Sequence, residues 1–124
     1  MCKGIIGCLL CGDFNWQDPK DGNALAFVEP QGEWLDVWEE ASSDNPGFTY
    51  DGKLNGMLAH RWRNRFDRIL MHGSAIAWGN AHLIGTEKVE GGLTYEKRTK
   101  SGGTRVLPVF PSDHFGVCED FVVV

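Results

Sequence analysis

Sixteen glycines among 124 residues are the feature of this sequence that most limits its fold. Their share is about twice the roughly 7% that is usual for proteins. Glycine adopts the backbone conformations of tight turns without steric cost, and it destabilises the interiors of helices. We therefore expect short strands joined by many turns, with little helix. The apolar content of 42% and charged content of 23% are typical of a folded chain rather than a disordered one.

The length suits one domain or part of one, and it is sufficient for a sizeable core. No apolar run reaches the roughly eighteen residues that a membrane helix needs. The apolar start from Met1 to Leu10 has no small-residue cleavage site, so we expect no signal peptide. Three of the four cysteines, Cys2, Cys8 and Cys11, crowd one end, which is a poor disulfide framework. This favours a reducing, intracellular compartment, either the cytoplasm or the nucleus.

Charge is distributed unevenly along the chain, although the net charge is −5. The segment from Asp13 to Asp51 holds ten acids and one base, whereas the segment from Lys53 to Arg105 holds ten bases and four acids. A chain divided in this way could hold a cation at one edge and a polyanion at the other. Unevenly charged, solvated loops explain the same pattern, and the charges alone do not separate the two interpretations.

The first strand that we expect is the apolar run from Ile5 to Cys11, which ends at Gly12. A short and nearly continuous apolar run is typical of a strand that is buried on both faces. The Cys8-x-x-Cys11 spacing is unlike a zinc site, because strand residues three apart point to opposite faces and no second ligand pair exists. We therefore expect two buried structural cysteines.

Periodicity and turn residues predict the other elements. The alternation from Arg65 to Met71 predicts a second strand. The spacing of apolar residues from Glu33 to Ala41 predicts a short amphipathic helix, with Trp34 and Trp38 in the core. The remaining predictions are long loops over Phe14–Gly32 and Glu90–Leu107, a turn over Ser42–Gly47, and extended segments over Phe48–Tyr50, Ala81–Val89 and Val117–Val124.

Three acidic motifs lie within predicted strands or at their ends: GDFN at Gly12–Asn15, RFDRI at Arg65–Ile69 and PSDHFG at Pro111–Gly116. Where a buried strand emerges, the sheet holds a carboxylate in place while the adjoining loop stays open to a substrate. Each motif alone fits turn chemistry as well as catalysis. Their conjunction and order are more specific than any one of them.

Taken together, GDFN, RFDRI and SDHFGV resemble the endonuclease/exonuclease/phosphatase family. The intervening DVWEE and GFTYDGKLN resemble the branch of that family that contains tyrosyl-DNA phosphodiesterase 2. The resemblance extends from about Leu9 to Val124. It implies a DNase I-like fold of the α/β (α+β) class, which is a four-layer α/β sandwich with mixed β-sheets and helices outside. Residues 1–124 would be the C-terminal half of that one domain, with no second domain.

The resemblance also implies roles for the site residues. His114 would lie next to the scissile phosphate, and Asp67 would orient its imidazole and stabilise the cationic form. Asp13 would activate or position the attacking water, or handle the leaving-group proton, and Asn15 would hydrogen-bond a non-bridging phosphate oxygen. Asp113 would lie at a cluster of metal and water, where oxygen ligands favour Mg²⁺ or Mn²⁺ over zinc.

The substrate that the resemblance implies is a phosphodiester, such as a DNA end carrying a 5′-phosphotyrosyl or related adduct. Tyr50 and Phe66 would form aromatic surfaces for DNA, and Ser112 would contact the substrate. The segment from Arg61 to Arg65, with Arg68, suits phosphates and stacked bases, although strand positions with solvated arginines explain it equally well. Other activities of the family stay open: structure-specific nuclease, RNA deadenylase, and lipid or inositol phosphatase.

The sequence departs from the family pattern in two respects. Gln17 stands where the branch commonly has arginine, which puts one phosphate clamp in doubt. The family's principal metal-binding glutamate and a phosphate-binding asparagine belong to an N-terminal half that these residues do not match. A chain that binds but does not catalyse is therefore an alternative, and that N-terminal half would be its partner.

Overall fold

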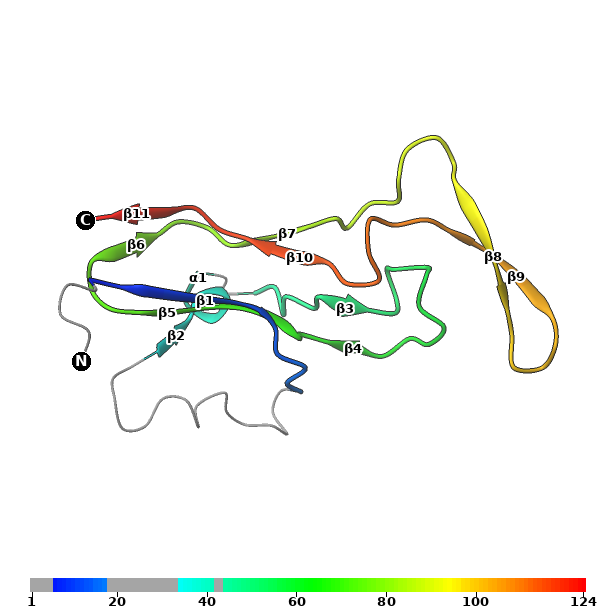
Figure 1. Ribbon diagram of the computed structural model, residues 1–124, viewed down its shortest axis with the longest axis horizontal. Helices are drawn as coiled ribbons and strands as arrows, with labels where there is room; N and C mark the ends of the chain where they lie inside the picture. Colours follow the sequence, from blue (N-terminus) through cyan, green and yellow to red (C-terminus); the bar gives the residue numbers. More distant parts are fainter. Residues whose placement is uncertain (1–5, 18–33, 42–43) are drawn as a thin grey trace.

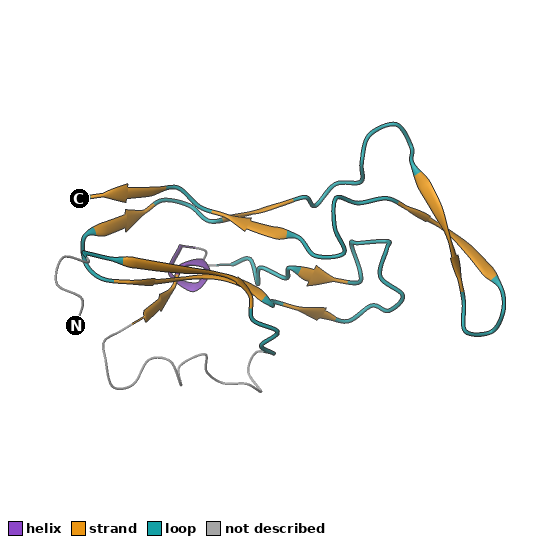
Figure 2. Cartoon of the chain, viewed as in Figure 1, coloured by secondary structure: helices purple, strands orange, loops and turns teal. Residues whose placement is uncertain are grey.

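The computed structural model describes residues 6–17, 34–41 and 44–124. Within these ranges the chain is rich in short strands and has a single helix, as the glycine content predicts (Figures 1 and 2). Most of the predicted loop over Phe14–Gly32 and two residues of the turn over Ser42–Gly47 lie outside the described residues. The elements are β1 (Cys8–Asp13), β2 (Trp34–Asp36), α1 (Val37–Ala41), β3 (Tyr50–Asp51), β4 (Arg63–Asn64), β5 (Asp67–His72), β6 (Ile76–Trp78), β7 (His82–Ile84), β8 (Thr94–Arg98), β9 (Thr104–Pro108), β10 (Gly116–Cys118) and β11 (Phe121–Val123).

Strand β5 is the centre of the largest sheet, where it pairs antiparallel with β1 on one side and β2 on the other. The strand predicted over Arg65–Met71 is thus present, and its residues from Arg68 to Met71 are buried. The other four pairings are two-stranded and antiparallel: β10 with β7, β11 with β6, β3 with β4, and β8 with β9.

The core lies between this sheet and the ribbon formed by β6, β7, β10 and β11. Val37, Ile69 and Met71 form its buried centre. Ile76, Trp78, Val117, Phe121 and Leu35 pack around that centre. Figure 1 shows the ribbon running alongside β1 and β5. Because apolar burial is the main stabilising term in folding, this contact holds the two layers together.

Residues 34–36 form a strand rather than the first turn of the predicted helix. β2 pairs with β5 through Leu35↔Met71 and its neighbours, and the helix begins only at Val37. Asp36 Oδ1 accepts a hydrogen bond from the Trp38 amide (3.2 Å), which caps the helix start. Pairing with β5 outweighs the helical spacing of the apolar residues in this segment, so residues 34–36 form a strand. Trp38 is buried in the core as predicted, and Trp34 is half-buried.

Strand β1 is exposed along all six residues, which corrects the prediction of a strand buried on both faces. It is an edge strand within the described sheet, so only β5 pairs with it. Cys8 and Cys11 are consequently exposed free thiols instead of buried cysteines. Leu9 and Leu10 are also exposed. Ile5, where the predicted strand began, lies outside the described residues.

The segment predicted as a loop over Glu90–Leu107 contains the β8–β9 hairpin. Thr94 pairs with Pro108 and Arg98 with Thr104, and Gly102 occupies the turn with a φ of 87°. Glycine adopts this left-handed conformation without strain. The predicted strands over Ala81–Val89 and Val117–Val124 are shorter than expected: β7 alone lies in the first, and β10 and β11 divide the second.

Three arginines of the predicted nucleic-acid patch are held inside the fold by acids. Arg65 Nη1 lies 2.7 Å from Asp36 Oδ2, and Arg68 Nη1 lies 2.9 Å from the same oxygen. Arg63 Nη2 lies 2.7 Å from Asp51 Oδ2. Both Arg65 and Arg68 are buried. For the buried Arg65 and Arg68, neither expectation, phosphate binding or solvation, is correct, because a buried guanidinium requires paired acceptors.

No helix in the described ranges is long and apolar enough to cross a membrane.

Candidate active site

Two carboxylates meet where β1 ends and β5 begins. Asp13 is the last residue of β1 and Asp67 the first of β5, and the two are direct partners in the antiparallel register. The Phe14 amide donates to the Phe66 carbonyl (2.9 Å) just beyond them. Asp13 is exposed and Asp67 is half-buried. Like charges directly opposite each other destabilise a sheet, so this pair indicates a site rather than a structural contact.

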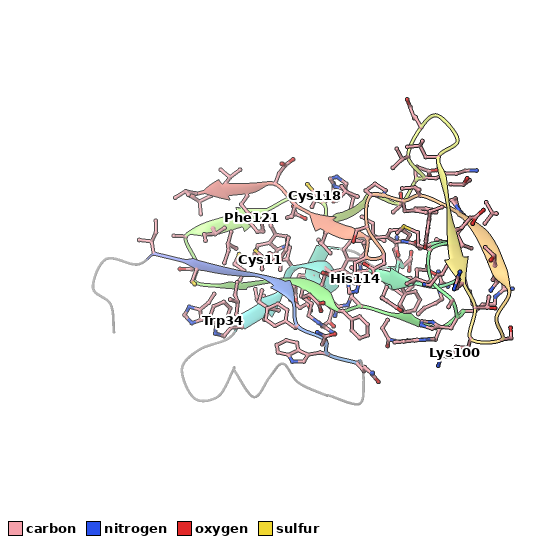
Figure 3. All side chains as sticks on the ribbon, turned by 45° about the vertical axis from the view of Figure 1, so that its right-hand side comes forward. Cys11, Trp34, Lys100, His114, Cys118 and Phe121 are labelled. Carbon is pink, nitrogen blue, oxygen red and sulfur yellow. The ribbon has the colours of Figure 1, made fainter. Side chains whose placement is uncertain are left out.

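His114 joins Asp67 from the loop that enters β10. Figure 3 labels His114. Its Nδ1 donates to Asp67 Oδ2 at 2.8 Å. The side chains are 24% and 22% exposed, which shields the hydrogen bond but leaves the imidazole accessible. The His114 amide donates to Ser112 Oγ (3.1 Å), and this hydrogen bond fixes the backbone from Ser112 to His114, which carries the ring. With Nδ1 occupied, Nε2 is the nitrogen that can act on a substrate.

Asn15 follows Asp13 in a left-handed backbone conformation with a φ of 54°. Its amide donates to Asp13 Oδ1 (2.8 Å), so the carboxylate and the turn stabilise each other. Positive φ is uncommon outside glycine, although asparagine tolerates it better than most residues. Strained conformations of this kind cluster at functional sites.

Thr49 links the two loops that carry Asp67 and His114. Its hydroxyl, which is completely buried, accepts hydrogen bonds from the amides of Phe66 (3.0 Å) and Asp67 (3.1 Å). Its carbonyl accepts from the amide of Phe115 (2.7 Å). One residue therefore positions the backbone next to both members of the pair. The sequence does not predict this role, because its only signal there is a threonine between two aromatic residues.

Asn55 holds the loop of the PSDHFG motif at Pro111–Gly116 in place. Its Nδ2 donates to the Ser112 carbonyl (2.8 Å), and its Oδ1 accepts from the Met57 amide (3.0 Å). The side chain is 1% exposed, so both contacts are shielded from water. Asn55 was not singled out in the sequence, because its partner lies 57 residues away.

An aromatic surface lies beside His114. The Tyr50 ring is 5.1 Å from the His114 ring, between centroids, in an edge-on arrangement. Phe66 packs against both, at 5.5 Å from Tyr50 and 6.0 Å from His114. Trp62 is 4.8 Å from Tyr50 and is the exposed member. Phe66 is buried, so a stacked ligand would meet Trp62 and Tyr50 before it.

The Tyr50 hydroxyl shares a hydrogen bond of 3.1 Å with His60 Nε2. Burial and the nearby negative charge of Asp113 raise the pKa of Tyr50 above its ordinary value. The phenol is therefore neutral at physiological pH. The effect of Asp113 on the pKa of Tyr50 means that this exposed carboxylate acts electrostatically on the aromatic surface. His60 itself is half-buried in contact with Tyr50.

Asp51 anchors the strand that carries Tyr50. Burial raises the pKa of its carboxyl, but hydrogen bonds from Arg63 and the amides of Lys53 and Leu54 outweigh this effect and lower the pKa below its ordinary value. Arg63 Nε lies 3.0 Å from Asp51 Oδ1. The ionised carboxylate thus fastens β3 to β4 underneath the aromatic surface.

Two carboxylates and one imidazole are the donor groups that could hold a divalent cation here. Ligand atoms of Asp13, Asp67 and His114 all lie within 4.8 Å of one another. His114 already uses Nδ1 for Asp67, so the group is unlike a zinc centre. Mg²⁺ is usually held by one or two carboxylates together with water and substrate phosphate. The exposed carboxylate of Asp13, beside that of Asp67, fits that requirement.

The structure brings together four residues predicted to act at the site: Asp13, Asn15, Asp67 and His114. The predicted aromatic residues Tyr50 and Phe66 adjoin them. Ser112 and Asp113 lie on the same loop as His114 and are exposed. The Ser112 hydroxyl contacts the His114 amide, so its observed role is to shape that loop.

No family model matches the chain. Among curated proteins it is similar to tyrosyl-DNA phosphodiesterase 2 from Xenopus laevis, with 36% identity over 97 residues. The protein of the same name from Xenopus tropicalis is 32% identical over 97 residues. Each match covers 73% of this chain and 22% of the relative. The chain thus spans about a fifth of the length of these relatives.

Two solved structures of tyrosyl-DNA phosphodiesterase 2 are similar in fold. The truncated Caenorhabditis elegans protein superposes with a TM-score of 0.59 at 23% identity, covering 95% of this chain and 39% of that one. The D. rerio protein, complexed with a single-strand DNA product, gives 0.65 at 25% identity, covering 94% and 42%. The expected DNase I-like α/β fold is confirmed for part of that domain. The chain therefore belongs to the endonuclease/exonuclease/phosphatase superfamily, as a tyrosyl-DNA phosphodiesterase 2-like part of its domain.

Proposed function

We propose that this chain carries part of the active site of a phosphodiesterase that hydrolyses adducts at DNA ends, such as a 5′-phosphotyrosyl bond. The observation that carries the proposal is the 2.8 Å hydrogen bond between His114 and Asp67, beside the carboxylate of Asp13. An imidazole oriented by a carboxylate, with a second acid close by, is a recurring arrangement for proton transfer and charge stabilisation.

In the proposed reaction, Asp67 holds the imidazole of His114 so that its protonated Nε2 donates to an oxygen of the scissile phosphate. Phosphoryl transfer concentrates negative charge on these oxygens, so electrostatic stabilisation supplies most of the catalysis. Asp13 accepts a proton from the attacking water, whose oxygen bonds to phosphorus as the bond from phosphorus to the tyrosyl oxygen breaks. The phenolate that leaves takes a proton from solvent. Asn15 follows it in the turn and offers its side-chain amide to a non-bridging oxygen.

A divalent cation, Mg²⁺ or Mn²⁺, would neutralise charge on the phosphoryl oxygens when it is bound. Asp13 and Asp113 are the residues of this chain that would hold it. The resemblance assigns the principal metal ligand of the family to an N-terminal half, which would be a partner in the complete site. We therefore propose that the 124 residues alone hydrolyse phosphodiesters slowly, although they bind the strand.

DNA is favoured over a lipid or inositol phosphate by the aromatic surface at Tyr50 and Trp62. Stacking on such side chains suits unpaired bases and is worth about 1–3 kcal/mol per base. Tyrosyl-DNA phosphodiesterase 2 from D. rerio, a relative in fold, has been crystallised with a single-strand DNA product. Faster hydrolysis of a phosphoinositide than of a DNA adduct would overturn this preference.

The experiment that tests the proposal measures hydrolysis of a 5′-phosphotyrosyl oligonucleotide by the chain complemented with the rest of the domain from the Xenopus laevis relative. His114→Ala should lower kcat by about a hundredfold or more, since it removes a transition-state interaction. The matched control is His82→Ala, because His82 is an exposed histidine on β7, and it should keep normal activity. Equal rates for the two variants, with equal melting temperatures, would refute the site.

A further inference from the structure

A groove of about 760 Å³ lies between the β8–β9 hairpin and the loop that joins β3 to β4. Figure 1 shows the hairpin projecting at the end of the molecule opposite β11, and Figure 3 labels Lys100 on it. Six basic residues line the groove: Lys53, Arg61, Lys97, Arg98, Lys100 and Arg105. No acid is among its lining residues.

Contacts between the hairpin and the loop fix the shape of the groove. The Phe110 amide, just beyond the hairpin, lies 3.2 Å from Met57 Sδ. The Tyr95 hydroxyl lies 3.5 Å from the Met57 carbonyl. Pro108 packs so closely on Gly56 that a Cβ there would be 2.8 Å from the proline Cγ. The hairpin is therefore seated on the loop rather than free beside it.

The charges of the groove are not neutralised by the fold. Of the ten bases between Lys53 and Arg105, the structure pairs Arg63, Arg65 and Arg68 with acids. The other seven make no ion pair within the described ranges, and six of these seven line the groove. A concave surface with one sign of charge attracts a polyanion.

The groove adjoins the aromatic surface of the active site. His60 lines the groove, and its Nε2 bonds to the Tyr50 hydroxyl at 3.1 Å. Tyr50 in turn contacts the ring of His114. A strand that stacks on Tyr50 and Trp62 would therefore reach the groove by passing His60.

We propose that this groove binds the sugar-phosphate backbone of a DNA strand that extends beyond the reactive phosphate. The inference rests on the proposed function, which places a DNA end at His114. Apolar residues form part of the lining, namely Leu58, Ala59, Leu107 and Pro108. A basic rim over an apolar floor matches the phosphates and the sugars or bases of a nucleic acid. An inositol phosphate has no apolar face to place there.

The test measures how tightly the chain binds single-stranded DNA across a salt series, with strands of about 4 and about 12 nucleotides. Lys97→Gln/Lys100→Gln/Arg105→Gln removes three groove charges at exposed positions. If each contacts one phosphate, the log–log salt slope for the long strand should fall by roughly 2, because each contact contributes about 0.7. Affinity for the long strand should fall at least tenfold, and binding of the short strand should change little.

Single substitutions guard against a folding artefact. Lys100→Gln alone should reduce the slope by about 0.7, whereas Lys88→Gln, at an exposed lysine outside the groove, should leave it unchanged. An unchanged slope and affinity in the triple variant would overturn the groove inference. The proposed function would survive that result if Trp62→Ala still weakened binding of both strands. Binding of inositol hexakisphosphate through the same three residues, without binding of the long strand, would also overturn the inference.

Discussion

Asp13 and Asp67 are direct partners in the last pair of the β1–β5 ladder, and both are carboxylates. A sheet designed only for stability would not place two acids there, because like charges opposite each other repel. The arrangement is useful only if a cation, the imidazolium of His114 or a metal ion, shares the space between them. Under the proposed function, the pair exchanges stability for catalysis, and this exchange can be measured.

Asp13→Asn should raise the melting temperature while it abolishes hydrolysis. The substitution removes the repulsion and keeps the size of the side chain, which should stabilise the fold by about 0.5 kcal/mol. Thermal unfolding and turnover of the complemented enzyme would be measured together. Asp120→Asn, at an exposed acid near β11, is the control and should change neither. A destabilised Asp13→Asn variant would mean that the pair is not repulsive.

Thr49→Val should destabilise the fold by about 2 kcal/mol and lower kcat. Valine has the same shape but leaves the amides of Phe66 and Asp67 buried without their acceptor. Denaturant unfolding gives the stability, and kcat reports the displacement of Asp67. Thr94→Val, at an exposed strand position, should be neutral on both measures. Full activity in Thr49→Val would show that the hydroxyl does not position the site.

Stability should depend on the ionisation of Asp51 only at low pH. The folded-state pKa of Asp51 is lowered, so its contribution is present above the ordinary value of 3.8 and is lost as pH falls through the lowered value. Asp51→Asn should cost about 2 kcal/mol at neutral pH, because Arg63 loses its charged partner. The difference from the unmutated chain should shrink below pH 3.8.

Urea unfolding at several pH values would measure this difference, with Glu87→Gln as the control at an exposed acid. A cost of the same size at every pH would show that the charge of Asp51 is irrelevant.

The 124 residues alone should self-associate. β1 is exposed throughout and pairs only with β5 within the described sheet, and Leu9 and Leu10 add apolar surface. Open strand edges and apolar patches favour pairing with another chain. Sedimentation should show dimers or larger species at micromolar concentration, and Leu9→Lys should reduce them. A monodisperse monomer whose β1 amides are strongly protected from hydrogen exchange would contradict this expectation.

The sequence predicted which side chains come together better than it predicted the elements around them. Asp13 and Asp67 were recognisable because each is next to a strand with a clear apolar or alternating pattern. β2 was missed because its pairing with β5 is a tertiary effect that helical spacing conceals. The β8–β9 hairpin was missed because glycine and charge were taken as signs of a loop, although Thr94, Tyr95 and Val106 favour strands.

Long-range pairing could not be predicted from the sequence. Arg65 and Arg68 resembled a nucleic-acid patch, and their partner Asp36 is about 30 residues away in the chain. The uneven charge distribution has two causes in the structure. Part of it reflects these internal pairs, and the rest is concentrated in the groove under the hairpin.

The central claim, that Asp67 acts through His114 on a phosphodiester, is tested most directly by a double-mutant cycle on kcat. The complemented enzyme, His114→Ala, Asp67→Ala and the double variant would each be assayed on the 5′-phosphotyrosyl oligonucleotide. We expect His114→Ala to cost more than Asp67→Ala, and the double variant to be no slower than His114→Ala, because the pair acts as a unit. Independent losses that multiply in the double variant would contradict the account.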